Sequence, residues 1–296
     1  MLKDAIMNGM PKYLRVLYPF TSKRFQTPDG SMAYLDEGRG DVPLLAVHGN
    51  PSWSFLYRNV VMAYQSERRV IVPDHLGMGL SDKPKGVDYS PSAHVERLVA
   101  LVNFLGLKQF DLMVHDWGGP IGMALAARYP ESVRRIVVMN TAAFRMKHMP
   151  WSLRVCRIPG LGRLIIQLMH GFAWPAAHVC VVRRMTPEVR DGFLWPYKRP
   201  SDREAMYRFV ESIPMKPADL EYMALVNIEQ GLAKLKNKPM QIHWGMKDFV
   251  FTEPFLEKWE QLFPDAHVYR YPWAGHYVLE DAASDVLARV REFLSA

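Results

Sequence analysis

The chain has 296 residues, of which 49% are hydrophobic, 12% aromatic and 23% charged. This composition excludes a mainly disordered chain, and the absence of an apolar run of about 18 residues argues against a membrane-spanning helix. The net charge is +7, and residues 141–238 carry all of the excess, with 16 Lys and Arg against 8 Asp and Glu. This segment is predicted to form either a solvated polar face or a surface that attracts an acidic partner or an anionic membrane.

Two features bear on location and association. The two cysteines, Cys156 and Cys180, are too few for a disulfide framework, so we expect a reducing compartment and a cytoplasmic protein. Polar residues and Pro11 interrupt the N-terminal apolar stretch, so the sequence predicts no secretory signal. An apolar cluster at 14–20 predicts either packing on its own domain, or contact with a second copy or a membrane surface.

Short apolar runs alternate with helical patterns along the first half of the chain. Buried strands are predicted at 44–49, 69–74, 110–115 and 135–139. Helices are predicted between them at 52–65, 91–105 and 120–128. This alternation is typical of a mostly parallel sheet with helices on both faces, which is an α/β fold.

The alternation stops after residue 140. Residues 141–238 contain many prolines and no good strand pattern, so they are predicted to form short helices. Strand patterns return at 240–244 and 267–271, and a C-terminal helix is expected from about Val286. The sequence therefore predicts two units, a main α/β domain of residues 1–140 and 239–296 and an inserted helical cap domain of residues 141–238.

Asp116 lies in the motif VHDWGG, between a predicted strand and a predicted helix. Hydrolases of the elbow type place their nucleophile, usually Ser, at such a turn, although an Asp there also suits a helix N-cap. Asp248 and His276 each follow a later predicted strand, and nucleophile, acid, histidine is the chain order of this fold. Since open α/β sheets place their sites at the carboxyl ends of strands, we predict a catalytic triad of Asp116, Asp248 and His276.

Four motifs resemble those of the haloalkane dehalogenases, a family of the α/β-hydrolase superfamily. They are HGNPSWSFLYR at 48–58, DHLGMGLSDKP at 74–84, VHDWGG at 114–119 and AGHYVLED at 274–281. The resemblance implies an α/β-hydrolase fold with a helical cap, no cofactor and no metal. It also implies that Asp116 displaces halide from a small apolar haloalkane, and that water activated by His276 hydrolyses the resulting aspartyl ester to an alcohol.

The same resemblance assigns the groups that bind the leaving halide ion. They are the Trp117 indole and the Asn50 side chain, and the backbone N–H groups of these two residues would stabilise the ester oxyanion. Some members take their acid from the strand before the cap, but this chain has Asn140 there. Asp248 therefore serves as the acid, as in the third dehalogenase subfamily, whose members tend to self-associate as homo-oligomers.

The motifs MNTAAF, MPWSLR, PYKRPSDR and WGMKDFVF also resemble the β-lactone decarboxylases of bacterial olefin biosynthesis. If Asp116 attacks the alkyl carbon of a β-lactone, the leaving group is a tethered carboxylate. The Asn50 and Trp117 donors would bind this carboxylate as they bind halide, and loss of CO2 would leave a cis-alkene. Dehalogenation is the first hypothesis from the sequence, and lactone decarboxylation is the alternative.

Other interpretations are weaker. Epoxide hydrolysis would need two cap tyrosines, from Tyr197, Tyr207 and Tyr222, and a non-catalytic scaffold need not keep all five site residues. The spacing of His170, His178 and Cys180 matches no common zinc site. No nucleic-acid partner is expected, whereas a membrane or pathway enzyme could contact the surface. Four cap residues are expected either to line an apolar pocket or to pack on the sheet, namely Trp151, Met169, Phe172 and Trp174.

Overall fold

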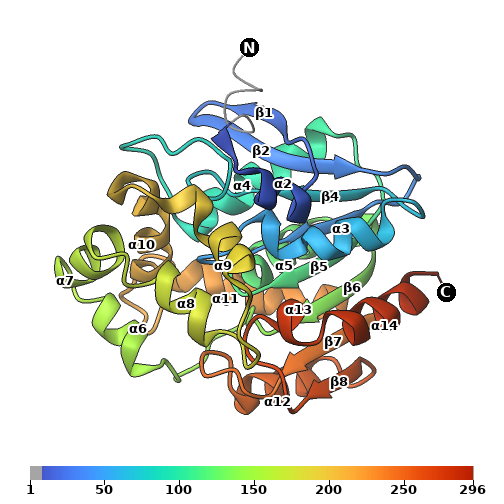
Figure 1. Cartoon of the computed structure of the whole chain (residues 1–296). Coiled ribbons are helices and arrows are strands. Elements are labelled where there is room, and N and C mark those ends of the chain that lie inside the picture. Colours follow the sequence, from blue (N-terminus) through green and yellow to red (C-terminus); the bar gives the residue numbers. More distant parts are fainter. Residues whose placement is uncertain (1–8, 296) are drawn as a thin grey trace.

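A computed structural model describes residues 9–295, which form one sheet with helices on both of its faces (Figure 1). The strand order across the sheet is β1-β2-β4-β3-β5-β6-β7-β8. The strands are β1 (Lys23–Thr27), β2 (Gly30–Glu37), β3 (Leu44–Val47), β4 (Val70–Pro73), β5 (Phe110–His115), β6 (Val133–Met139), β7 (Met240–Gly245) and β8 (His267–Tyr271).

The sheet is parallel from β4 through β8, and β1 and β2 join its edge in antiparallel pairing. Every residue of β3, β4, β5 and β7 is buried, as expected for parallel strands that are covered on both faces. The six strands for which the sequence predicts ranges are confirmed to within two residues. No range was predicted for β1, which is polar and largely exposed, or for β2, which is buried at residues 31–35 but ends in two acidic residues.

Helices of 4 to 14 residues surround the sheet. They are α2 (Lys12–Leu17), α3 (Arg58–Tyr64), α4 (Pro91–Phe104), α5 (Gly118–Arg128), α12 (Glu253–Leu262), α13 (Val278–Asp281) and α14 (Ala283–Ser295), with short 3-10 turns at Ser54–Tyr57 (η1) and Pro130–Ser132 (η2). The start of α4 is well specified, because the Ser90 side chain accepts a hydrogen bond from the Ala93 N–H and Pro91 occupies the first turn.

Between β6 and β7 the chain forms helices and no strand. They are α6 (Trp151–Cys156), α7 (Leu161–Arg163), η3 (Leu164–Leu168), α8 (Ala173–Val179), α9 (Pro187–Leu194), η4 (Trp195–Tyr197), η5 (Pro200–Arg203), α10 (Glu204–Glu211), α11 (Tyr222–Gly231) and η6 (Leu232–Leu235). We propose that this segment, residues 141–238, is a cap domain over the carboxyl end of the sheet.

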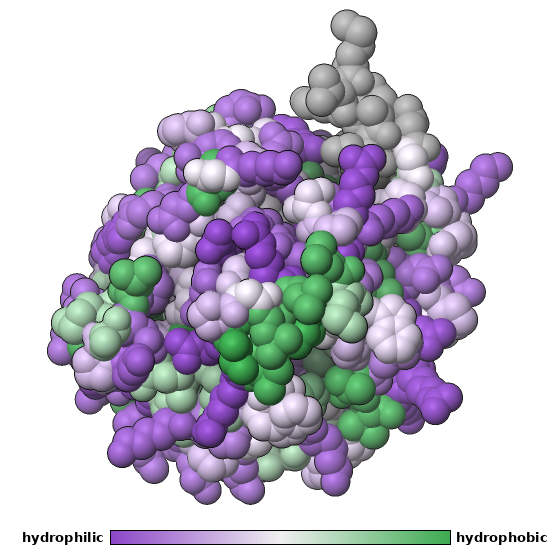
Figure 2. All heavy atoms as spheres, turned by 90° about the vertical axis from the view of Figure 1, so that its left-hand side faces the viewer, coloured by the Kyte–Doolittle hydropathy of each residue, from purple (hydrophilic) through white to green (hydrophobic). Residues whose placement is uncertain are grey.

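The surface of the cap segment is partly apolar. Figure 2, which views the side where α6, α7 and α8 lie in Figure 1, shows a hydrophobic patch among polar side chains. Exposed apolar side chains of this segment include Leu168, Met169, Trp174 and Val179. None of the described helices is both long and apolar enough to cross a membrane.

The N-terminal apolar cluster packs on the chain's own domain. Leu14, Tyr18 and Phe20 are buried, and α2 packs against α9 of the cap segment. The Tyr18 ring stacks near Trp53, and its hydroxyl pairs with that of Ser54 at 2.6 Å. The first of the two predictions for residues 14–20, packing on its own domain, therefore holds for these three residues.

Candidate active site

Asp116 stands at a sharp turn between β5 and α5. Its φ is +50°, a backbone conformation that costs a non-glycine residue free energy and is often found at functional sites. A Cβ on Gly118 would overlap the Val47 carbonyl, so glycine is required there for the close approach of α5 to β3. The Thr141 hydroxyl donates a hydrogen bond to the Asp116 carbonyl and holds the turn from the β6 side.

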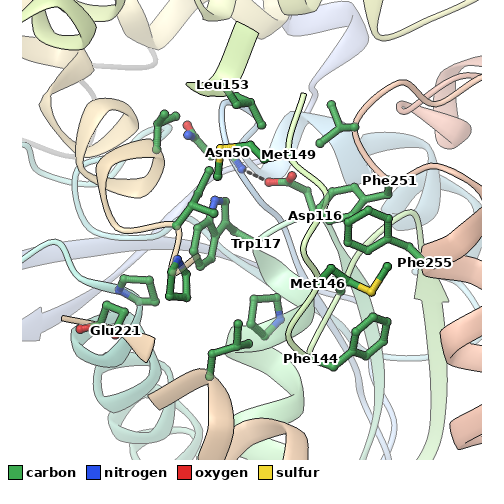
Figure 3. A pocket seen from close by; sticks show the side chains of 18 of the residues that line it. Asn50, Asp116, Trp117, Phe144, Met146, Met149, Leu153, Glu221, Phe251 and Phe255 are labelled. Atoms are coloured by element: carbon green, nitrogen blue, oxygen red, sulfur yellow. Dashed lines mark hydrogen bonds between the residues drawn. The ribbon is translucent and has the colours of Figure 1, made fainter. Parts of the chain in front are cut away.

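The two carboxylate oxygens of Asp116 have different surroundings. Oδ1 accepts a hydrogen bond of 2.6 Å from the Asn50 backbone N–H, and the Trp117 backbone N–H also donates to this carboxylate (Figure 3). Oδ2 lies 3.8 Å from Nε2 of His276. One of the predicted oxyanion donors, the Asn50 N–H, therefore already holds Oδ1, whereas Oδ2 faces His276.

His276 is fixed from behind by Asp248. Its Nδ1 lies 2.8 Å from Oδ2 of Asp248, and its ring stacks on Phe251 with the centroids 5.7 Å apart. The other Asp248 oxygen accepts a hydrogen bond of 2.7 Å from the Val250 N–H. The model thus brings the three predicted triad residues together at the carboxyl ends of β5, β7 and β8, with Nε2 of the imidazole facing Asp116.

Asn140 has a positioning role that the sequence analysis missed. Its Nδ2 donates to Oδ2 of Asp248 at 2.9 Å and to the Gly245 carbonyl, while its Oδ1 accepts from the Gly245 N–H at 2.8 Å. These contacts fix the amide and orient the acid. The available signal was positional, because Asn140 follows β6 directly and Asp248 follows β7, its neighbour in the sheet.

The two predicted leaving-group donors line the cavity next to Asp116. One N–H of the Asn50 amide donates to the Met206 carbonyl at 3.1 Å, which fixes its orientation and leaves its second N–H for a ligand. The Trp117 indole is half-buried and packs on Phe209 of α10, with ring centroids 5.3 Å apart. No described residue accepts a hydrogen bond from the indole N–H.

Burial and neighbouring charges shift the pKa values of both Asp116 and His276. Burial raises the pKa of Asp116 above that of an ordinary aspartate, although His276 and the backbone N–H groups of Trp117 and Asn50 lower it. Burial by itself would lower the pKa of His276, but the charge and hydrogen bond of Asp248 outweigh it and raise that pKa above its usual value.

These directions predict different pH profiles for the two reaction types. Alkylation needs ionised Asp116, so its rate should fall as the pH drops through the raised pKa of this residue and stay flat above it. Hydrolysis of an aspartyl ester also needs neutral His276, so it should continue to rise with pH above about 6.5. Steady-state rates of lactone loss, and of alcohol formation from a bromoalkane, between pH 5 and 9 check this. A rise in ester hydrolysis toward low pH would contradict it.

The cavity at Asp116 has a volume of about 700 Å³ and a mainly apolar lining. Of the four cap residues that the sequence offered as lining, Phe172 lines it. Trp151, Met169 and Trp174 instead point outward, with 78%, 69% and 54% of their surface exposed. They lie on short outer helices, whose buried face a sequence pattern of one or two turns cannot identify.

No tyrosine belongs to the described cavity lining. The Tyr197 hydroxyl bonds the backbone of Gly79 and Ser52, and the Tyr207 hydroxyl donates to Glu211. The tyrosine pair that epoxide hydrolysis would require is therefore not placed at the site. Within residues 9–295, no group of three or more His, Cys, Asp or Glu side chains is arranged to hold a metal ion.

The sequence and the fold of this chain were compared with those of known proteins. Residues 42–159 match a family model described as alpha/beta hydrolase fold. The chain is 40% identical to a cis-3-alkyl-4-alkyloxetan-2-one decarboxylase of Shewanella oneidensis, over 95% of this chain and 91% of the relative. It is 31% identical to haloalkane dehalogenase 2 of Mycobacterium bovis, over 93% of this chain and 96% of the relative. Haloalkane dehalogenase DbeA from Bradyrhizobium elkani has a similar structure, with a TM-score of 0.86 and 25% identity, covering 93% and 98% of the two chains.

Proposed function

Since this chain belongs to the haloalkane dehalogenase family of α/β-hydrolases, which includes relatives that decarboxylate oxetan-2-ones, we propose that it is a β-lactone decarboxylase. An oxetan-2-one is a four-membered β-lactone, and the relative's name places alkyl groups on both carbons between its carbonyl and its ring oxygen. The proposed reaction converts a cis-3,4-dialkyl β-lactone into a cis-alkene and CO2. This reverses the order of the two activities that the sequence motifs favoured.

The observation that carries the proposal is the size of the cavity at Asp116. At about 30 Å³ for each non-hydrogen atom, as in liquid water, 700 Å³ has room for roughly twenty such atoms. A lactone ring with two alkyl chains fills that space, whereas a haloalkane of a few carbons would leave most of it empty. The apolar lining matches alkyl chains, because burial of each CH2 group stabilises the complex.

We assign the first step to Oδ2 of Asp116. This oxygen attacks the ring carbon that bears the ring oxygen, forms an ester bond to it and inverts it, while the bond from that carbon to the ring oxygen breaks. The released oxygen becomes part of a carboxylate that is still attached to the neighbouring carbon. The Trp117 indole N–H and the free N–H of Asn50 are the donors for this new anion.

The second step needs no water. The electron pair of the bond to the carboxylate carbon forms the double bond and CO2 leaves, while the ester bond to Asp116 breaks and restores its carboxylate. Inversion in the first step places the ester and the carboxylate on opposite sides of the carbon–carbon bond. Anti elimination from this arrangement brings the alkyl groups of a cis-lactone to the same side, so a cis-alkene results.

A parallel product assay tests the proposal. Purified enzyme is incubated with a cis-3,4-dialkyl β-lactone, with detection of alkene by gas chromatography, and with 1-bromohexane, with detection of bromide. We expect catalytic turnover of the lactone to the cis-alkene at a higher kcat/KM than that for bromide release. Turnover of the bromoalkane with no alkene from any lactone would overturn the proposal.

Haloalkane hydrolysis is the second candidate, and one observation favours it. Nε2 of His276 faces Oδ2 of Asp116 at 3.8 Å, with Asp248 and Asn140 behind the imidazole, although the decarboxylation has no water to activate. This is the arrangement that hydrolysis of an aspartyl ester requires. We therefore expect some bromide and iodide release beside the main reaction, and slower release of chloride.

Replacing Asn50 by Ala should slow both reactions. The leaving anion loses one side-chain donor in either case, and the loss of such a donor typically costs roughly 10²–10³-fold in rate. Measured kcat/KM values for lactone loss and for bromide release check this in the parent and in Asn50→Ala. If the variant loses bromide release but keeps full lactone decarboxylation, the two anions do not share this donor, and attack at the lactone carbonyl becomes the better mechanism.

A further inference from the structure

We propose that the cavity has a separate arm, between α4, α5 and α11, which binds one of the two alkyl chains of the lactone along its full length. This inference rests on the proposed decarboxylase function and assigns the substrate's chain class. We call this part of the cavity the α5 arm. It is lined by Pro120, Ala124 and Ala127 of α5, by Val95 of α4, and by Ala224 and Ile228 of α11.

The α5 arm follows one face of the nucleophile helix. From Trp117, just before α5, the lining positions Pro120, Ala124 and Ala127 follow at spacings of three or four residues, and Arg128 ends the helix. Ala124 is partly accessible although it lies in mid-helix, where its neighbours on both sides are buried. Since α5 packs against both α4 and α11, the accessible surface of Ala124 faces the cavity rather than bulk solvent.

Small side chains keep the arm open. On α5 and α11 the facing positions include Ala124, Ala127 and Ala224, and none of these fills the space between the helices. The helices do approach closely at one point, because a Cβ on Gly231 would lie 2.8 Å from that of Ala127. Close packing of Ala127 on Gly231 therefore bounds the α5 arm at this point, and the arm is open beside Ala124.

The arm leads away from the rest of the cavity and ends at polar groups. In Figure 3, Glu221 lies on the opposite side of Trp117 from Phe255 and Phe251. Glu221 accepts hydrogen bonds from the Ser92 hydroxyl and N–H at the border of the arm. The far end is marked by the exposed ion pair of Arg128 with Glu96, 2.6 Å apart, both of which line the cavity. An alkyl chain in the arm would thus be covered until it reaches water at this pair.

The length of α5 sets the length of chain. The helix has 11 residues, which at about 1.5 Å each gives a channel of about 16 Å. With carbon–carbon bonds of about 1.5 Å, an extended chain of roughly twelve carbons spans that distance. The second alkyl chain then occupies the remaining space, which Phe144, Met146 and Phe255 line on the other side. The site accordingly selects lactones with at least one long alkyl chain.

The test blocks the arm with Ala124→Phe and uses four cis-lactones. Their alkyl groups are both methyl, both octyl, or one of each in either order. In the parent, a long chain in the arm should raise kcat/KM by at least roughly 100-fold, because each fully buried CH2 group contributes up to about fourfold. Ala124→Phe should lower kcat/KM by roughly 100-fold for the lactone with two long chains and for one of the two mixed lactones. It should leave the other mixed lactone and the dimethyl lactone within about threefold of the parent.

Two further variants control for misfolding. Ala224→Phe fills the arm from α11 and should give the same pattern, while Ala100→Phe adds the same ring at an exposed position of α4 and should change nothing. Equal losses of kcat/KM on both mixed lactones, or a kcat/KM that does not depend on chain length, would overturn the proposed arm. If the parent converts none of the four lactones, the proposed function is wrong. Calorimetry with unreactive 1-dodecanol then tests the arm separately. Tight binding that Ala124→Phe abolishes supports the arm, and binding that Ala124→Phe leaves unchanged overturns it.

Discussion

Asp116→Ala is expected to abolish turnover of lactones and haloalkanes alike, by roughly 10⁵–10⁶-fold, as the loss of a covalent nucleophile does in comparable enzymes. Both proposed reactions begin with a bond from Oδ2 of Asp116 to carbon, and within residues 9–295 no other carboxylate lies in its place. Asp248 is hydrogen-bonded to His276 and Asn140, on the far side of the imidazole from the reacting oxygen. Asp116→Asn should be equally inactive, because a neutral amide does not displace a carboxylate or a halide.

The measurement is alkene and halide formation over hours at high enzyme concentration, with thermal melting to show that each variant folds. A matched control is Asp265→Ala, which removes an exposed carboxylate between α12 and β8 and should keep parent activity. Removal of the desolvated Asp116 carboxylate should leave the melting temperature unchanged or slightly higher, since burial disfavours its charge. Residual activity above about one per cent in Asp116→Ala would show that the ester is not on the pathway.

His276→Phe should separate the two reactions. Phe keeps the aromatic ring that stacks on Phe251 but cannot take a proton from water. With 1-bromohexane, the variant should release one bromide for each active site and then stop, because the hexyl ester on Asp116 is formed but not hydrolysed. Intact-protein mass spectrometry should show the added hexyl group. With a β-lactone, the variant should continue to make alkene within about tenfold of the parent rate, since no water takes part.

The comparison with Asp116→Ala sharpens this experiment. No adduct should form in that variant, and a double variant with His276→Phe should behave the same way. An undiminished rate of bromide release in His276→Phe would remove His276 from the hydrolytic step. If lactone decarboxylation is lost as completely as haloalkane hydrolysis, His276 acts in the first step, and the water-free mechanism proposed here is wrong.

Much of the parallel core, and the edge of the sheet that carries the chemistry, can be predicted from the order of the residues. Buried parallel strands are short apolar runs, so β3 to β7 could be recognised one by one, and the residues that follow the parallel strands share one edge of the sheet. Asp116, Asp248 and His276 were predicted for that reason, and the structure brings them together. The predicted roles of Asn50 and Trp117 as leaving-group donors came from the resemblance to a known family. Strand and helix patterns alone do not indicate such roles.

Features that depend on contacts between distant segments could not be predicted and are seen in the folded chain alone. Asn140 and Asp248 are 108 positions apart, and their hydrogen bond exists because β6 and β7 are neighbours in the sheet. The outward orientation of Trp151 and Trp174 depends on how short cap helices lie on the domain, which one or two helical turns do not encode. The α5 arm depends on the gap that three packed helices leave beside Ala124, because a cavity is a property of the space between side chains rather than of the side chains themselves.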